Sequence, residues 1–284
     1  MILNCGSAIK TCNNAEVRNP FHFVLTLDLC NNAGSLHRKS FSPLTSSVLY
    51  LLLNPLTFSA DRLADTPQAR TRIKLCGLSR PSDVDHAVAL GTDAVGFVFY
   101  PKSPRAVTIE QAGELARRVP PFVSAVGLFV NATSNELAHV LDAVPLTTLQ
   151  FHGEEIPEQC LALAREARLP WIRALRVGAS TQRADLVKLA LQYSIASSLL
   201  FDTHVQDYGG SGKVFDWSLI PEEFAYRAVL SGGLSAQNVD GAIRQIHPYA
   251  VDVSSGIEIP SEKGVKDHAR MAAFVSAVRA ADAK

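Results

Sequence analysis

A single cysteine ends the first apolar run in the regular part of the chain, and a glycine follows it directly. The segment reads Arg-Ile-Lys-Leu-Cys-Gly over residues 72–77. A thiol whose pKa is lowered from about 8.5 gives a thiolate near neutral pH, and a thiolate can act as a base or a nucleophile. Free cysteine is also among the residue types most often buried without any reactivity. Whether Cys76 is reactive therefore depends on the groups that the fold places beside it.

Several polar residues stand at, or just after, the end of an apolar run. They are Cys76, Arg105, Gln150, His152, Asp202 and Asp252. In a barrel of parallel strands these ends meet at one mouth, where such folds carry their chemistry. Cys76 and Asp202 are then the candidates for acid–base catalysis. Asp202 is equally well explained as the cap of a turn, because aspartate favours caps and turns.

Two of these candidates have competing interpretations. His152 is better explained as a hydrogen-bonded residue at a strand end than as a catalyst. Arg105 could be a plain surface charge, but it follows Pro101 and Pro104 in the loop after the second apolar run. A loop stiffened by proline suits a fixed guanidinium that binds a carboxylate through two parallel hydrogen bonds.

Two glycine-rich stretches follow the last two apolar runs, at residues 231–233 and 254–256. Turn formation would explain either stretch alone. In (β/α)8 barrels the loops after strands seven and eight frequently bind phosphate, because glycine lets backbone N–H groups approach the anion. Two such stretches at adjacent strand ends favour a phosphorylated small-molecule ligand. The predicted phosphate-binding residues are Gly232, Gly233, Ser254, Ser255 and Gly256.

Residues 71–284 alternate short apolar runs with amphipathic segments, which predicts an α/β fold of repeated strand–helix units. Each run is apolar enough to be buried on both faces. The predicted strands are 72–76, 94–99, 123–129, 147–151, 171–175, 198–202, 228–231 and 250–254. Eight parallel strands fit a compact (β/α)8, or TIM, barrel. A doubly wound open sheet is the alternative, but no Gly-x-Gly-x-x-Gly follows the first strand.

Helix starts are marked between the predicted strands. Thr108 with Gln111 and Thr133 with Glu136 have the spacing of capping boxes, which satisfy unpaired backbone donors at a helix start. After the sixth strand the helical pattern weakens. Only a short helix near residues 216–220 is expected there.

The first 70 residues differ from the remainder because they show no sustained strand or helix period. We predict an unstructured or adventitious extension over 1–70 and a barrel catalytic domain over 71–284. The apolar run 48–53 is too short to span a bilayer, and a signal peptide fits poorly. Residues 207–213 contain three glycines and could form either a mobile lid or a solvated linker.

Composition narrows the classes of function. The 284 residues are 47% apolar, which is enough for a sizeable core. The 27 basic and 27 acidic residues cancel, so charge gives no reason to expect nucleic acid or a membrane as a partner. Five cysteines without a Cys-x-x-Cys spacing argue against a disulfide scaffold or a zinc site. They favour a reducing compartment, and we predict the cytoplasm.

Residues 71–284 resemble the phosphoribosylanthranilate isomerases of tryptophan biosynthesis. The resemblance is carried, in the family's order, by segments 74–77, 96–99, 103–105, 149–153, 200–202, 209–212, 215–217, 231–234 and 251–258. Leu75 stands where the family usually has isoleucine, a conservative change that leaves Cys76 in register. The resemblance does not extend to residues 1–70.

The resemblance implies an Amadori rearrangement of N-(5-phosphoribosyl)anthranilate to 1-(2-carboxyphenylamino)-1-deoxyribulose 5-phosphate, without a metal or an organic cofactor. It implies that Cys76 is the general base and Asp202 the general acid. The implied substrate-binding residues are Arg105 for the anthranilate carboxylate, Asp252 for the ribose or the reacting centre, and Gln150 and His152. A thiol of lowered pKa and a carboxyl held protonated would suit these roles. A monomer or a homodimer is expected.

Two alternatives stay open. Another phosphosugar barrel, such as an indole-glycerol-phosphate synthase or a histidine-pathway isomerase, would use different acid–base residues, and the cysteine of the first strand argues against it. The second alternative is a phosphate-ligand sensor that keeps the barrel without catalysis. Cys76 and Asp202 count against a sensor. The fold alone decides neither case, because barrels host many chemistries.

Overall fold

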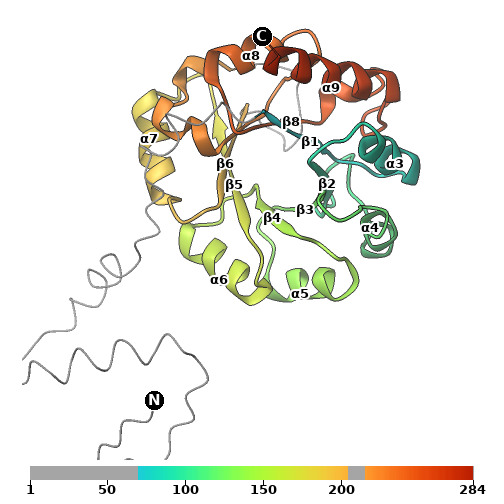
Figure 1. Cartoon of the computed structure of the whole chain (residues 1–284). Helices are drawn as coiled ribbons and strands as arrows, with labels where there is room; N and C mark the ends of the chain where they lie inside the picture. The colour runs from blue at the N-terminus through green and yellow to red at the C-terminus, as the bar shows by residue number, and fades with distance from the viewer. Residues whose placement is uncertain (1–69, 204–214, 284) are drawn as a thin grey trace, which may run out of the picture. The chain divides into compact units, whose positions relative to one another are not determined.

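The computed structural model describes residues 70–203 and 215–283, which form a closed barrel of eight parallel strands. The strands follow one another around the barrel in chain order, and the last pairs with the first. Their bounds are β1 Arg72–Cys76, β2 Ala94–Val98, β3 Ser124–Phe129, β4 Thr148–Phe151, β5 Trp171–Val177, β6 Ser198–Thr203, β7 Ala228–Leu230 and β8 Ala250–Val253. Helices encircle these strands (Figure 1). The predicted (β/α)8 barrel is confirmed.

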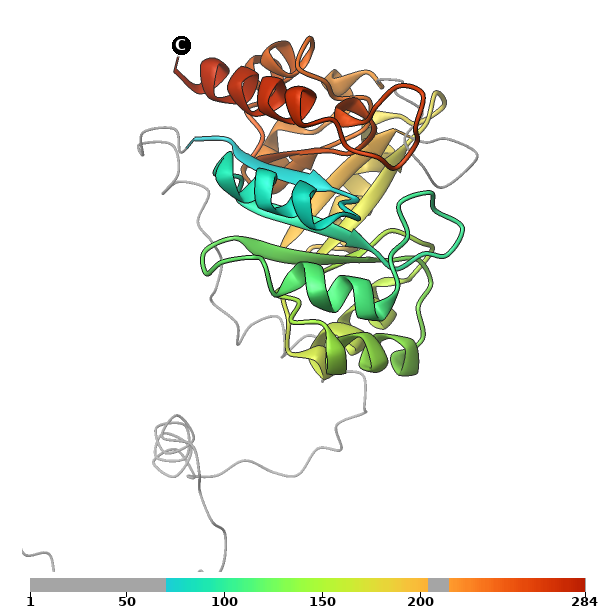
Figure 2. The same cartoon turned by 90° about the vertical axis from the view of Figure 1, so that its right-hand side faces the viewer.

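The connecting helices lie on the outside of the barrel and run alongside the strands (Figure 2). They are α3 Pro81–Ala89, α4 Ile109–Ala116, α5 Ser134–Ala143, α6 Pro157–Ala167, α7 Arg183–Gln192, α8 Val239–Ile246 and α9 His268–Asp282. The described ranges also contain three short 3₁₀ helices, η3 Trp217–Leu219, η4 Glu222–Arg227 and η5 Ser255–Ile257. The described residues between β6 and β7 form η3 and η4 without an α-helix, and η3 falls inside the predicted segment 216–220.

Two hydrophobic cores follow from the alternation of side chains along each strand. The larger core lies between the strands and the helices, and residues such as Leu75, Phe97 and Phe201 are fully buried there. The smaller core fills the inside of the barrel. Its members occupy neighbouring register positions on four consecutive strands and are Ala174, Leu200, Val229 and Ala250.

Beyond the small inner core, toward the carboxyl ends of the strands, the interior of the barrel contains buried polar side chains. Lys74 of β1 and Asp252 of β8 are direct register partners, and they are 4% and 5% exposed. Charged residues are almost never buried unless they are paired. A polar floor therefore lies between the inner core and the mouth of the barrel.

Both predicted capping boxes are confirmed. The Thr108 hydroxyl accepts from the backbone N–H of Gln111, whose side chain accepts in return from the backbone N–H of Thr108. Thr133 and Glu136 make the same reciprocal pair at the start of α5. Each box fixes the point at which a loop from the mouth of the barrel turns back into a helix.

The strand predictions hold to within one residue at each end, with one exception. β5 runs to Val177, two residues beyond the predicted end. These additional residues continue the ladder with Asp202 and Thr203 of β6. Pairing with a neighbouring strand, which local sequence does not reveal, extends β5 here.

Two sequence predictions concern residues outside the described ranges. These are the extension over residues 1–70, of which only Arg70 is described, and the lid or linker at residues 207–213. Within residues 70–203 and 215–283, no helix is both long and apolar enough to cross a membrane.

Candidate active site

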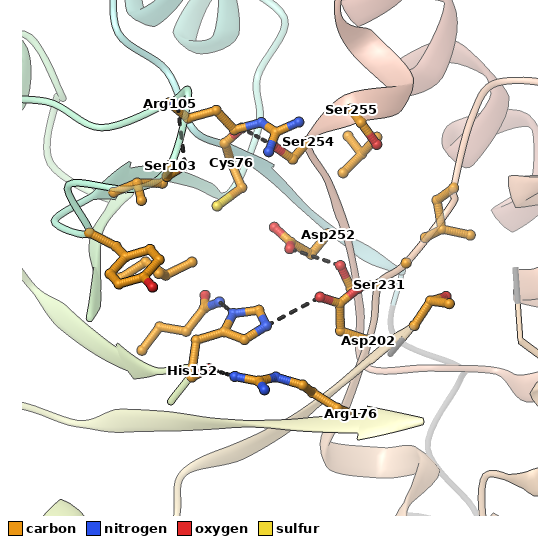
Figure 3. A pocket seen from close by; sticks show the side chains of 18 of the residues that line it. Cys76, Ser103, Arg105, His152, Arg176, Asp202, Ser231, Asp252, Ser254 and Ser255 are labelled. Atoms are coloured by element: carbon orange, nitrogen blue, oxygen red, sulfur yellow. Dashed lines mark hydrogen bonds and ion pairs between the residues drawn. The ribbon is translucent and has the colours of Figure 1, made fainter. Parts of the chain in front are cut away.

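A pocket opens at the carboxyl ends of the strands, where the polar residues predicted from the sequence meet. Ten of the predicted site residues line it, namely Cys76, Arg105, Gln150, His152, Asp202, Gly232, Gly233, Asp252, Ser254 and Ser255. Cys76, His152, Asp202 and Asp252 point into the same space from four different strand ends (Figure 3). The remaining one, Gly256, does not line the pocket.

Cys76 is a buried thiol at the end of β1, and it is 4% exposed. The sequence-based expectation of a lowered pKa is wrong for this geometry, because burial raises the pKa of the thiol. Lys74 and Lys266 act in the opposite direction and lower it, whereas Asp252 raises it further. A thiol with a raised pKa is mostly protonated at neutral pH. Its ionisation therefore depends on the cations that surround it.

Asp202, His152 and Gln150 form a chain of hydrogen bonds across the pocket. Gln150 Nε2 lies 3.2 Å from His152 Nδ1, and His152 Nε2 lies 3.2 Å from Asp202 Oδ2. An amide nitrogen only donates, so Nδ1 accepts and the Nε2–H donates to the carboxyl of Asp202. This arrangement holds the orientation of Asp202. It leaves the second oxygen of Asp202, Oδ1, which borders Gly232, to carry or release a proton.

The Asp252 carboxylate is held by two partners. Lys74 Nζ donates to Oδ1 at 2.7 Å, and the Ser231 hydroxyl donates to Oδ2 at 3.1 Å. Burial alone lowers the pKa of Lys74, but Asp252 and Cys76 outweigh this effect and raise it. The charged ammonium form of Lys74 is therefore favoured beneath the pocket.

Arg105 is buried in the loop after β2 and forms a bidentate pair with Glu258. Its Nε and Nη2 donate to the two carboxylate oxygens at 2.5 and 3.0 Å. The buried Lys266 donates to Glu258 Oε1 and to the backbone carbonyl of Ser254, both at 3.0 Å. Burial alone would raise the pKa of Glu258, but the two cations hold it below its ordinary value. This cluster joins the loops after β2 and β8.

The pairing with Glu258 limits how Arg105 can bind a ligand. Glu258 occupies the side of the guanidinium formed by Nε and Nη2, and Arg105 also lines the pocket. A guanidinium has five N–H donors, so its other edge, Nη1 with the second proton of Nη2, can still bind a carboxylate through two hydrogen bonds. The predicted role of Arg105 as a carboxylate binder therefore stays a prediction and applies to that edge.

The glycine-rich loops after β7 and β8 touch each other. Gly232 and Gly233 have φ values of 79° and 70°, a region that residues with a Cβ rarely adopt. A Cβ on Gly256 would lie 1.9 Å from the carbonyl oxygen of Leu234, so only glycine permits this approach. Among the backbone hydrogen bonds of the described residues, none uses the N–H groups of Gly232, Gly233 or Ser255. These donors are available to an anion.

Three buried charged residues that pair with predicted site residues were missed by sequence reasoning. They are Lys74, Glu258 and Lys266, each at most 5% exposed. Lys74 gave one signal, a charge inside an otherwise apolar run. Glu258 ends a segment that carries the family resemblance, and Lys266 has no local signal. Their roles depend on partners that only the closed barrel brings together.

A (β/α)8 barrel that joins a thiol, a carboxyl and two glycine-rich loops at one mouth is typical of an enzyme that moves protons on a phosphorylated substrate. Among the described residues, no group of three or more His, Cys, Asp or Glu side chains could hold a metal ion. The family model for N-(5'-phosphoribosyl)anthranilate (PRA) isomerase matches residues 73–277. The chain belongs to this family, and it is an isomerase of tryptophan biosynthesis.

Individual relatives agree with the family model. The N-(5'-phosphoribosyl)anthranilate isomerase of Ralstonia nicotianae is 61% identical over 226 residues, which are 76% of this chain and 96% of that protein. A solved structure of monomers of the dimeric Thermotoga maritima enzyme is 38% identical, covers 74% of this chain and 99% of its own, and has a TM-score of 0.63.

A further solved structure contains a ligand. It is a phosphoribosyl anthranilate isomerase in complex with reduced 1-(o-carboxyphenylamino)-1-deoxyribulose 5-phosphate. It is 38% identical, covers 74% of this chain and 99% of its own, and has a TM-score of 0.63.

Replacing Glu258 by glutamine is expected to destabilise the barrel strongly, because it leaves Arg105 and Lys266 as buried cations without a counter-charge. Removing one partner from a buried ion pair typically costs about 3–5 kcal/mol of the free energy of unfolding. The matched control is Asp85→Asn, which breaks a bidentate but exposed pair with Arg118. Because water screens exposed pairs, the control should change little. Urea denaturation at pH 7 measures both, and equal losses would contradict this role of Glu258.

Proposed function

We propose that this isomerase acts on N-(5-phosphoribosyl)anthranilate with Cys76 as the general base and Asp202 as the general acid. The observation that carries the proposal is that these two groups, far apart in the sequence, line one pocket beside two glycine-rich loops. The ligand of the related solved structure, a reduced 1-(o-carboxyphenylamino)-1-deoxyribulose 5-phosphate, has the skeleton of the expected product.

The chemistry needs one proton donor and one proton acceptor on the same substrate. Asp202 gives a proton to the furanose ring oxygen, the ring opens, and the nitrogen lone pair completes a protonated Schiff base at C1′. The Cys76 thiolate then removes the proton from C2′, and the electron pair of that C–H bond moves toward the nitrogen to give an enolamine. Protonation at C1′ and loss of the proton of the C2′ hydroxyl give the ketone. A positioned acid and base each contribute about 10²–10⁴-fold to such steps.

The two charged ends of the substrate would be bound by two different parts of the pocket. The anthranilate carboxylate would bind the free edge of the Arg105 guanidinium. The phosphate would bind the backbone N–H groups of Gly232, Gly233 and Ser255, because unpaired backbone donors favour an anion. Ser254 and Gly256 would shape the same loop. Binding at both ends fixes the reacting carbons between them.

Gln150, His152 and Asp252 would orient the reacting centre. Gln150 Oε1 is buried and accepts no hydrogen bond within the described part of the chain, so it is available to an N–H or O–H of the substrate. His152 holds the proposed acid, Asp202, through its Nε2–H. Asp252 lies beside both Ser231 and Lys74 and would contact a ribose hydroxyl or the reacting carbon.

We further propose a homodimer formed through the opposite face, at the amino ends of the strands. Phe122, in the loop between α4 and β3, is fully exposed and has a φ of 72°. Bulky residues rarely adopt this region. Phe122 borders a hollow at that face, as does Tyr249. A second copy that covers the phenyl ring would explain a large apolar side chain held outward on a strained backbone. The Thermotoga maritima relative is described as dimeric.

The cytoplasm is the compartment that we infer for the enzyme. Both cysteines in the described ranges, Cys76 and Cys160, are free thiols. Free thiols persist in a reducing compartment, and the proposed base needs its thiol unoxidised.

Cys76→Ala and Asp202→Asn are each expected to lower kcat by at least about 10²-fold with the fold retained, because each removes a positioned acid or base. The measurement supplies N-(5-phosphoribosyl)anthranilate, generated in situ, and follows the loss of its anthranilate-type fluorescence. Near-wild-type turnover by either variant would exclude its assigned role. Wild-type protein that binds the substrate without turnover would favour the alternative function, a phosphate-ligand sensor that does not catalyse.

Arg105→Lys is expected to lower kcat/KM for the same substrate by roughly ten- to a hundred-fold, because lysine keeps the charge but loses the planar fork. Inhibition by inorganic phosphate serves as the control and should be unchanged. If both Arg105→Lys and Arg105→Ala keep the wild-type kcat/KM, the carboxylate must be bound elsewhere.

Phe122→Glu is expected to convert a dimer into a monomer, because a charge would be buried at the centre of the proposed interface. Light scattering during gel filtration measures the mass of each variant. Ile156→Glu is the matched control, since Ile156 is also exposed but lies at the carboxyl-end face. A monomeric wild type, or a dimer that survives Phe122→Glu, would refute this interface.

A further inference from the structure

Lys74 is a buried charge inside the barrel to which the proposed reaction gives no task. It is 4% exposed, and its ammonium contacts the Asp252 carboxylate at 2.7 Å. A buried lysine is costly unless its charge is paired and hydrogen-bonded. An apolar side chain would fill the same space without the desolvation cost of a buried charge. A second group that the ammonium of Lys74 affects would account for the presence of this charge.

The second neighbour of Lys74 is the thiol of Cys76. The two residues stand two positions apart on β1, so both face the inside of the barrel. Their neighbour on β2 is Gly96, the register partner of Cys76. A Cβ on Gly96 would lie 2.7 Å from Cys76 Sγ and 3.2 Å from Lys74 Nζ. The sulfur and the ammonium therefore border the same small space, which the missing side chain of Gly96 leaves open.

We propose that Lys74 is a positioning residue whose ammonium favours the thiolate form of Cys76 for proton removal, and that the negative charge of Asp252 opposes this effect. The proposal rests on the proposed function in assigning the base role to Cys76. The charges of the buried pair, Lys74 and Asp252, then determine how readily the thiol of that base ionises. Lys74 itself touches neither the substrate nor the transferred proton.

The charges around the thiol predict the direction of each effect. Burial raises the pKa of Cys76, Lys74 lowers it by charge and by hydrogen bonding, and Asp252 raises it. Lys266, from the segment before α9, also lowers it. The other ionisable groups that line the pocket are Arg105, His152, Arg176 and Asp202. Lys74 acts through both charge and a hydrogen bond, so it is the largest opponent of burial.

A purely structural role for the pair makes a different prediction. If Lys74 and Asp252 only fill and brace the barrel, replacing either one should loosen Cys76 in the same way. If the pair sets the charge at the sulfur, the two replacements should shift the ionisation of Cys76 in opposite directions. The sign of the two shifts therefore separates the interpretations.

The experiment measures the rate at which iodoacetamide alkylates Cys76 as a function of pH, read from the mass of the peptide that contains it. This peptide readout separates Cys76 from the other four cysteines. Lys74→Met should move the midpoint about 1–3 pH units higher, and Asp252→Asn should move it lower. Lys74→Arg keeps the charge and should stay near the wild-type midpoint.

The double variant Lys74→Met/Asp252→Asn leaves no buried charge unpaired, which protects the test against misfolding of the single variant. Its midpoint should lie above that of the wild type, because the effect of Lys74 on the thiol exceeds that of Asp252. A midpoint at or below the wild-type value would overturn the proposal. So would shifts in the same direction for Lys74→Met and Asp252→Asn.

The pH profile of kcat/KM connects this ionisation to turnover. The acid limb is the part of the profile where kcat/KM rises with pH as the base ionises. In Lys74→Met this limb should move to higher pH by the same amount as the alkylation midpoint, and in Lys74→Arg it should stay near its wild-type position. A lower plateau with an unmoved limb would indicate a structural role and contradict the proposal. Alkylation needs no substrate, so it tests Lys74 even if the wild type fails to turn over N-(5-phosphoribosyl)anthranilate, a failure that would count against the proposed function alone.

Discussion

Two clusters of buried charge lie on the side of the pocket formed by β1, β2 and β8, and each carries its own counter-charges. In the first, Lys74 contacts Asp252; in the second, Glu258 lies between Arg105 and Lys266. A buried charge without a partner costs several kcal/mol, so each cation fixes the place of its carboxylate. The first cluster sets the surroundings of the thiol at the end of β1. The second joins the loop after β2 to the loop after β8.

The pocket divides its tasks between side chains and backbone. Side chains from β1, β4, β6 and β8 surround the space where the reacting carbons would lie, whereas the loops after β7 and β8 present backbone N–H groups. Closure of the sheet makes this division possible, because β8 pairs with β1 and brings the two ends of the barrel sequence together. The Ser254 hydroxyl donates to the backbone carbonyl of Cys76 at 3.0 Å, so the glycine-rich loop after β8 is bonded directly to the end of β1.

The barrel and the residues around its mouth could be predicted from the sequence because their signals are local. Each buried strand is a short apolar run, and each capping box joins residues three positions apart. The charge clusters could not be predicted, since Lys74 and Asp252 are 178 residues apart and Arg105 and Glu258 are 153 apart. The direction of the pKa shift of Cys76 was also missed, because burial depends on the strands that close around it.

The central claim, that Cys76 faces C2′ of a substrate held at both ends, is tested most directly by a crystal structure with reduced 1-(o-carboxyphenylamino)-1-deoxyribulose 5-phosphate. We expect C2′ in contact with Cys76 Sγ, the aryl carboxylate on the free edge of the Arg105 guanidinium, and the phosphate on the backbone of Gly232 and Gly233. A ligand whose C2′ lies against Asp202 and away from the sulfur would contradict the claim. A phosphate bound away from the two glycine-rich loops would contradict it as well.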